Sequence, residues 1–333
     1  MKNASIVIKS IGVYHPKRSV GNEVFIEHFK KLDKDITDLL NFFGRNTRYI
    51  SDDPKENTVT MAIEASKSAL EKSKISAEEI DLLIFSSGTP EYLAPTNSLK
   101  VHNAIGGKST AIVYDMNANC VGMIVAVEQA SRYMLSNPEM KKALVVGAEQ
   151  MNKFSQETDE ITSSSFGDAS CAVILEKVED TESGFIDAVF YTNSERTHDM
   201  LFPECGMSNI YNPNISEQGK RIYWYGGSGG NGFAIVKSQI DALFERNHIS
   251  NKDISGYFIS QICKQNIIDL AAAMEEDSDK FTYIGDTFGY TGTSSPFIAL
   301  NHAIDTNKIK RGDYIIIWSV GTGFFAAGTL WRY

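Results

Sequence analysis

Apolar residues along the chain form two kinds of pattern. Continuous apolar runs at residues 82–86 (LLIFS) and 143–148 (ALVVGA) predict strands that are covered on both faces. Between them, residues 119–135 begin with small side chains and continue at helical spacing, which predicts a buried helix. The order of strand, helix and strand predicts an α/β architecture with helices packed against sheets.

The same order of elements occurs twice. Ile80 and Ser86 of one segment correspond to Ile254 and Ser260 of another. Three pairs of segments correspond at nearly the same offset: 74–87 with 248–261, 119–135 with 292–306, and 141–149 with 311–321. We therefore expect a duplicated α/β fold, in which similar halves (1–172 and 173–333) form a layered sandwich of sheets and helices.

Residues 314–331 (YIIIWSVGTGFFAAGTLW) form the most apolar segment of the chain. Its length would allow a membrane-spanning helix, but Gly321, Gly323 and Gly328 interrupt it. Because β-forming residues flank these glycines, we expect two buried strands joined by a turn. The first residues show no secretory leader pattern, and we expect a cytoplasmic protein.

Composition argues against some classes of protein. The 333 residues include 42 Asp or Glu and 32 Lys or Arg, giving a net charge of −10. A nucleic-acid-binding protein normally carries a basic face, so this balance argues against one. The four cysteines, Cys120, Cys171, Cys205 and Cys263, form no Cys-x-x-Cys pair, so neither a zinc site nor a disulfide framework is expected.

Cys120 lies where an extended run passes into the predicted helix (DMNANCVGMIVAVEQ, residues 115–129). Unpaired N–H groups at a helix N-terminus favour a thiolate and lower its pKa from about 8.5. Such a thiolate can attack a thioester, because one thioester replaces another. The alternative interpretation is a packing cysteine, since cysteine is often buried.

Several motifs together resemble one family. They are IGVYHP, NANCVGM, SSSFGDASCAVILE, RIYWYGGSGGNGFAIV and GTGFFAAGTLWRY. In a duplicated chain of this length they resemble the thiolase superfamily, and more closely ketoacyl-(acyl-carrier-protein) synthase III, the chain-initiating condensing enzymes. The resemblance implies a thiolase-like duplicated fold and an acyl thioester on Cys120. It implies oxyanion donors at the backbone of Cys120 and of Gly323 or Phe324.

The chain departs from this family at the Cys-His-Asn triad. By ungapped matching, Gln261 stands in the place of the His and Tyr290 in the place of the Asn. An amide and a phenol can donate hydrogen bonds, but neither is a base near neutral pH. Loss of one preorganised donor costs about 100–1000-fold in rate. We therefore expect decarboxylative condensation to suffer more than acylation of Cys120.

The resemblance also implies how substrates arrive. No metal or bound cofactor is implied, because the acyl group comes on the phosphopantetheine of acyl carrier protein or CoA. Asn231 matches a pantetheine-binding residue, although its context GSGGNG also fits a weak dinucleotide motif. Asp38 and Phe42 replace the residues that grip the CoA nucleotide, which favours a carrier protein. Ala94 replaces a bulky residue at the acyl pocket and predicts a longer acyl group.

Two functions remain open from the sequence. The first is an acyltransferase of specialised metabolism, and the second is a largely non-catalytic partner subunit of a related synthase. The resemblance implies a homodimer, and a heterodimer fits the second function. Because carrier proteins are acidic, we expect a local basic patch, with these candidates: Lys264, Arg246, Lys308, Lys310 and Arg311.

Overall fold

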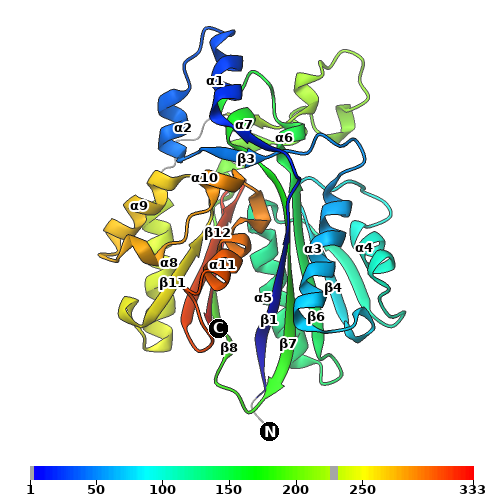
Figure 1. The fold of residues 1–333 in the computed structure, drawn as a ribbon, viewed down its shortest axis with the longest axis vertical. Coiled ribbons are helices and arrows are strands. Elements are labelled where there is room, and N and C mark those ends of the chain that lie inside the picture. The colour runs from blue at the N-terminus through cyan, green and yellow to red at the C-terminus, as the bar shows by residue number, and fades with distance from the viewer. Residues whose placement is uncertain (1–3, 226–231) are drawn as a thin grey trace.

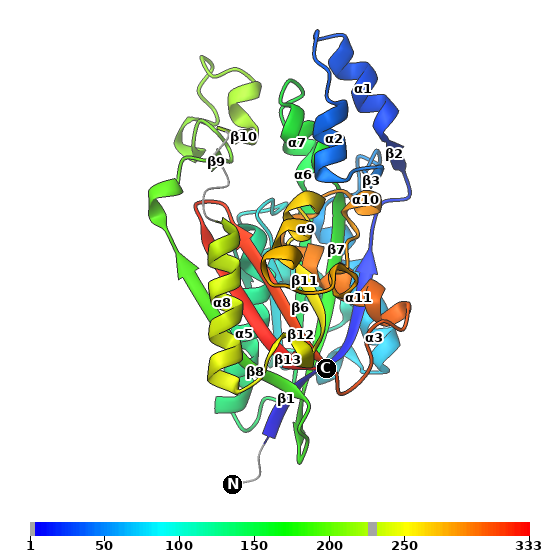
Figure 2. The same cartoon turned by 90° about the vertical axis from the view of Figure 1, so that its left-hand side faces the viewer.

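Two sheets, with helices between and outside them, make up the fold (Figures 1 and 2). The computed structural model describes residues 4–225 and 232–333. The first sheet has the order β1-β7-β6-β4-β5, in which β4, β5 and β6 are parallel. Its strands are β1 (Ala4–Tyr14), β4 (Leu82–Ser86), β5 (Ile112–Met116), β6 (Lys142–Gln150) and β7 (Asp168–Glu179).

The second sheet has the order β11-β12-β13-β8, with β11 parallel to β12. Its strands are β8 (Gly184–Thr192), β11 (Ile254–Ile259), β12 (Tyr314–Gly321) and β13 (Phe325–Arg332). The predicted pair of strands at residues 314–331 is thus confirmed as β12 and β13, which are antiparallel. Within the described ranges, no helix is long and apolar enough to span a membrane.

Helices form the other three layers of the sandwich. α5 (Gly122–Ser136) and α11 (Ser295–Asp305) lie between the sheets, and α3 (Thr58–Ser73) and α4 (Asn97–Ile105) cover the outer face of the first sheet. α8 (Gly232–Asn247) and α9 (Lys264–Ala273) cover the second. Alternate residues of β4 pack into the central and outer layers, which explains its continuously apolar sequence. The predicted layered α/β fold is confirmed.

The two halves repeat each other in backbone detail. Lys74 and His248 adopt left-handed conformations with φ of 57° and 54°. Each is followed by a one-turn 3-10 helix with a capping box, formed by Ser76 with Glu79 and by its counterpart, Ser250 with Asp253. The strands β4 and β11 begin directly afterwards, so the predicted correspondence of 74–87 with 248–261 is confirmed.

The boundary between the halves differs from the expected one. Residue 172 lies inside β7, which pairs along its length with β1 and β6 of the first sheet. β8, which follows β7 in the chain, pairs with β13 of the second sheet. The division at residues 172 and 173 is therefore corrected to the connection between β7 and β8.

Short elements cover the end of the sandwich where β4 and β6 finish. They are β2 (Ser19–Gly21), α1 (Asn22–Lys30), α2 (Thr37–Phe43), β3 (Thr47–Tyr49), α6 (Met151–Phe154), α7 (Glu160–Ser165), β9 (Met200–Leu201), β10 (Tyr223–Trp224) and α10 (Gly285–Phe288) (Figure 2). The buried guanidinium of Arg45 donates to the carbonyls of Ser165, Ile262 and Gly285. Arg45 thereby joins this cap to the segment that follows β11.

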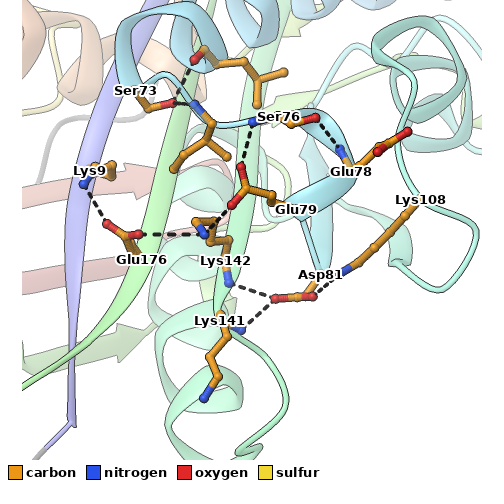
Figure 3. Close-up of polar contacts among 12 residues, drawn as sticks. Lys9, Ser73, Ser76, Glu78, Glu79, Asp81, Lys108, Lys141, Lys142 and Glu176 are labelled. Carbon is orange, nitrogen blue, oxygen red and sulfur yellow. Dashed lines mark hydrogen bonds and ion pairs between the residues drawn. The ribbon is translucent and has the colours of Figure 1, made fainter.

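A charged cluster closes the opposite end of the first sheet (Figure 3). Asp81, at the start of β4, accepts hydrogen bonds from the Lys108 ammonium and from the backbone N–H groups of Lys141 and Lys142. The Lys142 ammonium in turn contacts Glu79 at 2.8 Å. These contacts tie the starts of β4 and β6 together.

Candidate active site

Cys120 lies in a one-turn 3-10 helix, η2 (Asn119–Val121), between β5 and α5. Asn119 has a φ of 53°, so the chain turns sharply just before the cysteine. On the facing segment, the turn η8 (Gly292–Ser294) contacts η2 and starts α11. The duplicated fold thus brings its two helix starts together at the centre of the molecule.

Two cavities meet at the Cys120 thiol. The first, of about 280 Å³, has mainly apolar walls, among them Phe166, Trp224, Val236, Ile262, Leu270 and Trp318. The second, of about 300 Å³, has a more polar wall that includes Gly88, Thr89, Asn117, Asn119, Glu149 and Thr197. Cys120, Met151, Met200, Thr322 and Gly323 line both. A molecule with two arms could therefore place its centre at the sulfur.

The electrostatics at Cys120 differ from the expected ones. Burial, reinforced by the charge of Glu149, raises the pKa of the thiol to about 12. This corrects the expectation that a helix N-terminus lowers the pKa of Cys120. The N–H of Met123, in the first turn of α5, already donates to Thr293 Oγ1 at 2.6 Å. A thiol here needs a proton acceptor or a hydrogen-bond donor to react.

Tyr290 supplies such a donor. Its hydroxyl forms a hydrogen bond with the Cys120 thiol, and this contact lowers the pKa of the thiol. Backbone hydrogen bonds to Ser165 (2.8 Å) and Gly167 (3.0 Å) fix the residue, and its side chain is buried. Burial and the neighbouring Cys120 raise the pKa of Tyr290 well above its usual value, so the phenol stays protonated and donates.

The Gln261 side chain does not reach the site of Cys120. Its amide donates to the carbonyls of Ile259 (2.7 Å) and Thr282 (3.1 Å), and its carbonyl accepts from the N–H of Ile284 (2.8 Å). Both amide hydrogens are thus engaged, and the side chain is fully buried outside both cavities. This corrects the expectation that Gln261 acts in place of the triad His, because it anchors the backbone instead.

Ser260 is the residue that sequence matching missed. It lines the first cavity, and its hydroxyl donates to the Tyr290 oxygen at 3.3 Å. Successive residues of an extended segment point to opposite sides, so Ser260 faces the site and Gln261 faces away. The repeat in the sequence indicates this position of Ser260. It pairs Ser260 with Ser86 and Cys120 with Thr293, and the hydroxyl of Ser86 lies 3.4 Å from that of Thr293.

The glycine-rich turn after β12 forms a wall next to Cys120. Gly323 lines both cavities and has a φ of 77°, which favours glycine. The Phe324 N–H donates to the Gly321 carbonyl at 3.1 Å within this turn. Of the two turn residues expected to hold an oxyanion, Gly323 is therefore the better placed.

The other expected site residues lie apart from the thiol. Ala94 is exposed and lines neither cavity of its own chain, so its expected role requires a second copy. Asn231 lies outside the described residues. Among the residues that the structure describes, no histidine lines either cavity.

Four of the five basic candidates lie at the end of the molecule away from the two cavities. Residues 308–311 precede the start of β12, whereas the cavities lie at its other end. Arg246 is in the last turn of α8 and pairs with Asp187 at 2.8 Å, far along the helix from the cavity-lining Gly232. Only Lys264, beside the cavity-lining Ile262 and Asn266, stays close to the site.

Glu149 near the end of β6 is a buried carboxylate in the second cavity. It accepts hydrogen bonds from the N–H of Gly88 (2.9 Å), from the N–H and hydroxyl of Thr89 (3.1 and 2.7 Å), and from the Ser87 hydroxyl (3.4 Å). Burial raises its pKa to about 7, against these hydrogen bonds. A charged residue at the end of an apolar strand was a signal that could have identified it.

Comparison with known proteins agrees with the family resemblance and with the fold. The two sequence profiles of the 3-oxoacyl-(acyl-carrier-protein) synthase III family match residues 114–194 and 244–333. A β-ketoacyl-(acyl-carrier-protein) synthase III of Clostridium novyi is 32% identical over 324 residues, covering 96% of each chain. Another, of Clostridium perfringens, is 29% identical, covering 97% of each.

The solved structures agree. The 3-oxoacyl-(acyl-carrier-protein) synthase III of Aquifex aeolicus superposes with a TM-score of 0.85, at 26% identity over 99% of this chain and 100% of that one. These relatives favour an acyltransferase over the alternative of a non-catalytic subunit. The chain therefore belongs to the 3-oxoacyl-(acyl-carrier-protein) synthase III family of thiolase-fold acyltransferases.

Proposed function

We propose that Cys120 takes an acyl group from a phosphopantetheine thioester and passes it to an acceptor. The observation that supports this most is the meeting of two cavities at one thiol. A thioester carries an acyl group and a pantetheine arm on the two sides of its carbonyl carbon. Each cavity would receive one of these arms.

The proposed acylation exchanges one thioester for another. The Cys120 sulfur attacks the carbonyl carbon, and the carbonyl oxygen becomes an oxyanion that the N–H groups of Cys120 and Gly323 hold. The bond to the pantetheine sulfur then breaks, and this sulfur leaves as a thiol with one proton. The Tyr290 hydroxyl, held by Ser260, donates to the Cys120 sulfur while it carries negative charge.

Decarboxylation of a malonyl thioester is the weaker activity in this proposal. Its enolate would find one phenol donor, Tyr290, in place of a His and an Asn. Loss of a preorganised donor costs about 100–1000-fold. The chain would thus serve best as an acyl-accepting transferase whose acceptor brings its own nucleophile.

The proposed donor is an acyl carrier protein. Asp38 and Phe42 on α2 are exposed and offer no cation for a nucleotide phosphate. Lys264, at the start of α9, is the basic residue that would meet the acidic carrier.

The proposed assembly is a homodimer through the edge strand β5. This strand pairs only with β4 in the described sheet and leaves its other edge open. Apolar side chains are exposed nearby, and they include Leu93, Leu99 and Ile112. Ala94 lies in the same loop and would approach the cavity of the second copy.

Intact-mass spectrometry tests the proposal. The protein is incubated with a panel of acyl carrier protein and acyl-CoA thioesters, with Cys120→Ser as the control. We expect a mass increase equal to one acyl group that requires Cys120 and is faster with carrier-bound donors. If no donor of the panel gives a Cys120-dependent adduct, the proposed function is wrong.

A further inference from the structure

Acylation of Cys120 requires a place for the thiol proton. The thiol is protonated in the free protein, because burial raises its pKa to about 12. Tyr290 cannot accept this proton because its raised pKa keeps the phenol protonated, and Ser260 and Gln261 have no basic group at neutral pH. The residues in and beside the triad positions therefore leave the proton without an acceptor.

Two carboxylates line the described cavities. Asp199 lies in the first and is paired with Arg196 at 2.5 Å, so a guanidinium already occupies its carboxylate. Glu149 lies in the second, and the described contacts to its carboxylate come from neutral hydroxyl and backbone groups. A buried carboxylate without a cation partner is poised to take up a proton.

Glu149 is also close to the cysteine turn. A methyl group added at Gly88 would lie 3.5 Å from Glu149 Oε1 and 3.8 Å from the Cα of Asn119, the residue before Cys120. Oε1 accepts one hydrogen bond, from the Gly88 N–H, whereas three donors reach Oε2. Oε1 is therefore the oxygen with room for a further proton, from the thiol itself or through one water.

We propose that Glu149 is the general base that removes the Cys120 proton and returns it to the leaving pantetheine sulfur. This inference rests on the proposed acyl transfer. The S–H bond of Cys120 breaks as a proton joins the carboxylate, and the sulfur electron pair forms the bond to the acyl carbon. The electrons of the broken carbon–sulfur bond stay on the pantetheine sulfur, which takes the proton back from the carboxylic acid. Atoms and charge balance with no further reactant.

The titration of Glu149 supports this role. Its pKa of about 7 is raised chiefly by burial, and general base catalysis is most effective with a pKa near the working pH. The titratable groups that interact with it across the site are Cys120 and Tyr290, and both are neutral at that pH. Arg196 and Asp199 form a separate ion pair on the first cavity.

The direction in which Glu149→Gln changes the alkylation rate of Cys120 distinguishes a general base from a carboxylate that only repels the thiolate. The rate of Cys120 alkylation by iodoacetamide is measured by mass spectrometry between pH 5.5 and 9, with Cys120→Ser correcting for the other cysteines. If Glu149 is the base, the wild-type rate rises through a pH of about 7 and Glu149→Gln is roughly 100-fold slower at pH 7.5. If Glu149 only repels the thiolate, removing its charge lowers the pKa of Cys120 and the same variant reacts faster. The faster reaction would overturn the proposal.

A second variant keeps the test valid if Glu149→Gln does not fold. Thr89→Val removes one donor to Oε2, which raises the pKa of the carboxyl. The inflection of the wild-type profile should then move to higher pH, and an unmoved inflection would overturn the proposal. Thr89→Ser, which keeps the hydroxyl, should restore the wild-type profile.

Alkylation needs no acyl donor, so the two proposals can fail separately. A protein that accepts no acyl group but shows the Glu149-dependent profile disproves the acyl transfer and leaves Glu149 as the base for the thiol. A protein that is acylated at wild-type rates after Glu149→Gln disproves the base and leaves the acyl transfer.

Discussion

The two helix starts at the centre of the molecule share a backbone and differ in chemistry. Asn119 before Cys120 and Gly292 before Thr293 both have a φ of 53°, and each begins a 3-10 turn that leads into a central helix. The Thr293 side chain is fully buried, and its oxygen accepts the Met123 N–H. Cys120 instead opens onto two cavities. The turn that holds Thr293 therefore caps α5, the helix that follows the Cys120 turn. The Cys120 turn instead holds a nucleophile.

The residues opposite each turn explain this difference. Ser86 faces Thr293 directly, with 3.4 Å between the two hydroxyl oxygens. Its counterpart Ser260 donates to the Tyr290 hydroxyl, which in turn forms a hydrogen bond with Cys120, and all of these residues line the first cavity. A duplicated fold can thus keep one copy of a site packed for stability while the other copy is left open for substrate.

The largest expected effect comes from restoring the family residues on the open side. The double variant Ser260→His and Tyr290→Asn should release CO2 from a malonyl thioester about 100-fold faster than wild type, because the enolate then has two preorganised donors instead of one. Radiometric CO2 assays measure this.

Gln261→His with Tyr290→Asn is the matched control. It should gain no activity and lose about 2–4 kcal/mol of stability, because Gln261 makes three buried hydrogen bonds. A gain from the control alone would reinstate Gln261 as the His position.

The next effect concerns the packed side. Thr293→Val should lower the free energy of unfolding by about 2 kcal/mol, because the Met123 N–H loses its buried acceptor. Denaturant titration measures the change. Thr293→Ser keeps the oxygen and should cost less, and equal losses for both variants would argue that packing, not capping, is the role of Thr293.

A third effect tests the Asp81 cluster at the end of the first sheet away from the cavities. This cluster ties the starts of β4 and β6 together. Burial of Asp81 opposes its ionisation, but hydrogen bonds from Lys108 and from two backbone N–H groups outweigh it and lower its pKa. A lowered folded pKa contributes stability above the unfolded pKa of about 3.9, and this stability is lost as the pH falls through the folded pKa. Asp81→Asn should cost about 1.5 kcal/mol at pH 7. The difference from wild type should shrink below about pH 4, and a pH-independent difference would contradict the account.

The smallest effect separates the two matched serines. Ser260→Ala removes the donor that orients the Tyr290 hydroxyl, and acylation of Cys120 should slow about 5-fold, the worth of one neutral hydrogen bond. Stopped-flow or quenched mass spectrometry measures the rate. Ser86→Ala removes the equivalent hydroxyl on the packed side and should leave the rate unchanged. Equal slowing by both variants would remove Ser260 from the site.

The fold was largely predictable because its signals are local or repeated. Continuous apolar runs, the matched segments 74–87 and 248–261, and the glycines within residues 314–331 each correspond to an element of the structure. The half boundary was misplaced because β7 is apolar on both sides of residue 172.

The site was less predictable, because side-chain direction depends on alternation along a strand. A shift of one residue exchanges Ser260 for Gln261, and ungapped matching could not show which of them faces the thiol. The pKa of Cys120 was misjudged for a related reason. Cys120 is half-buried, and the segments that desolvate its thiol, such as the turn after β12 and the loop of Tyr290, lie far from it in the sequence.

Peptide mapping after incubation with an acyl carrier protein thioester tests the central claim most directly. The protein is digested and each peptide is weighed, so the peptides that contain Cys120 and Thr293 are read in one experiment. We predict one acyl group on the Cys120 peptide, none on the Thr293 peptide, and none anywhere in Cys120→Ser. An acyl group on another residue, or an unmodified Cys120 with every donor of the panel, would contradict the account.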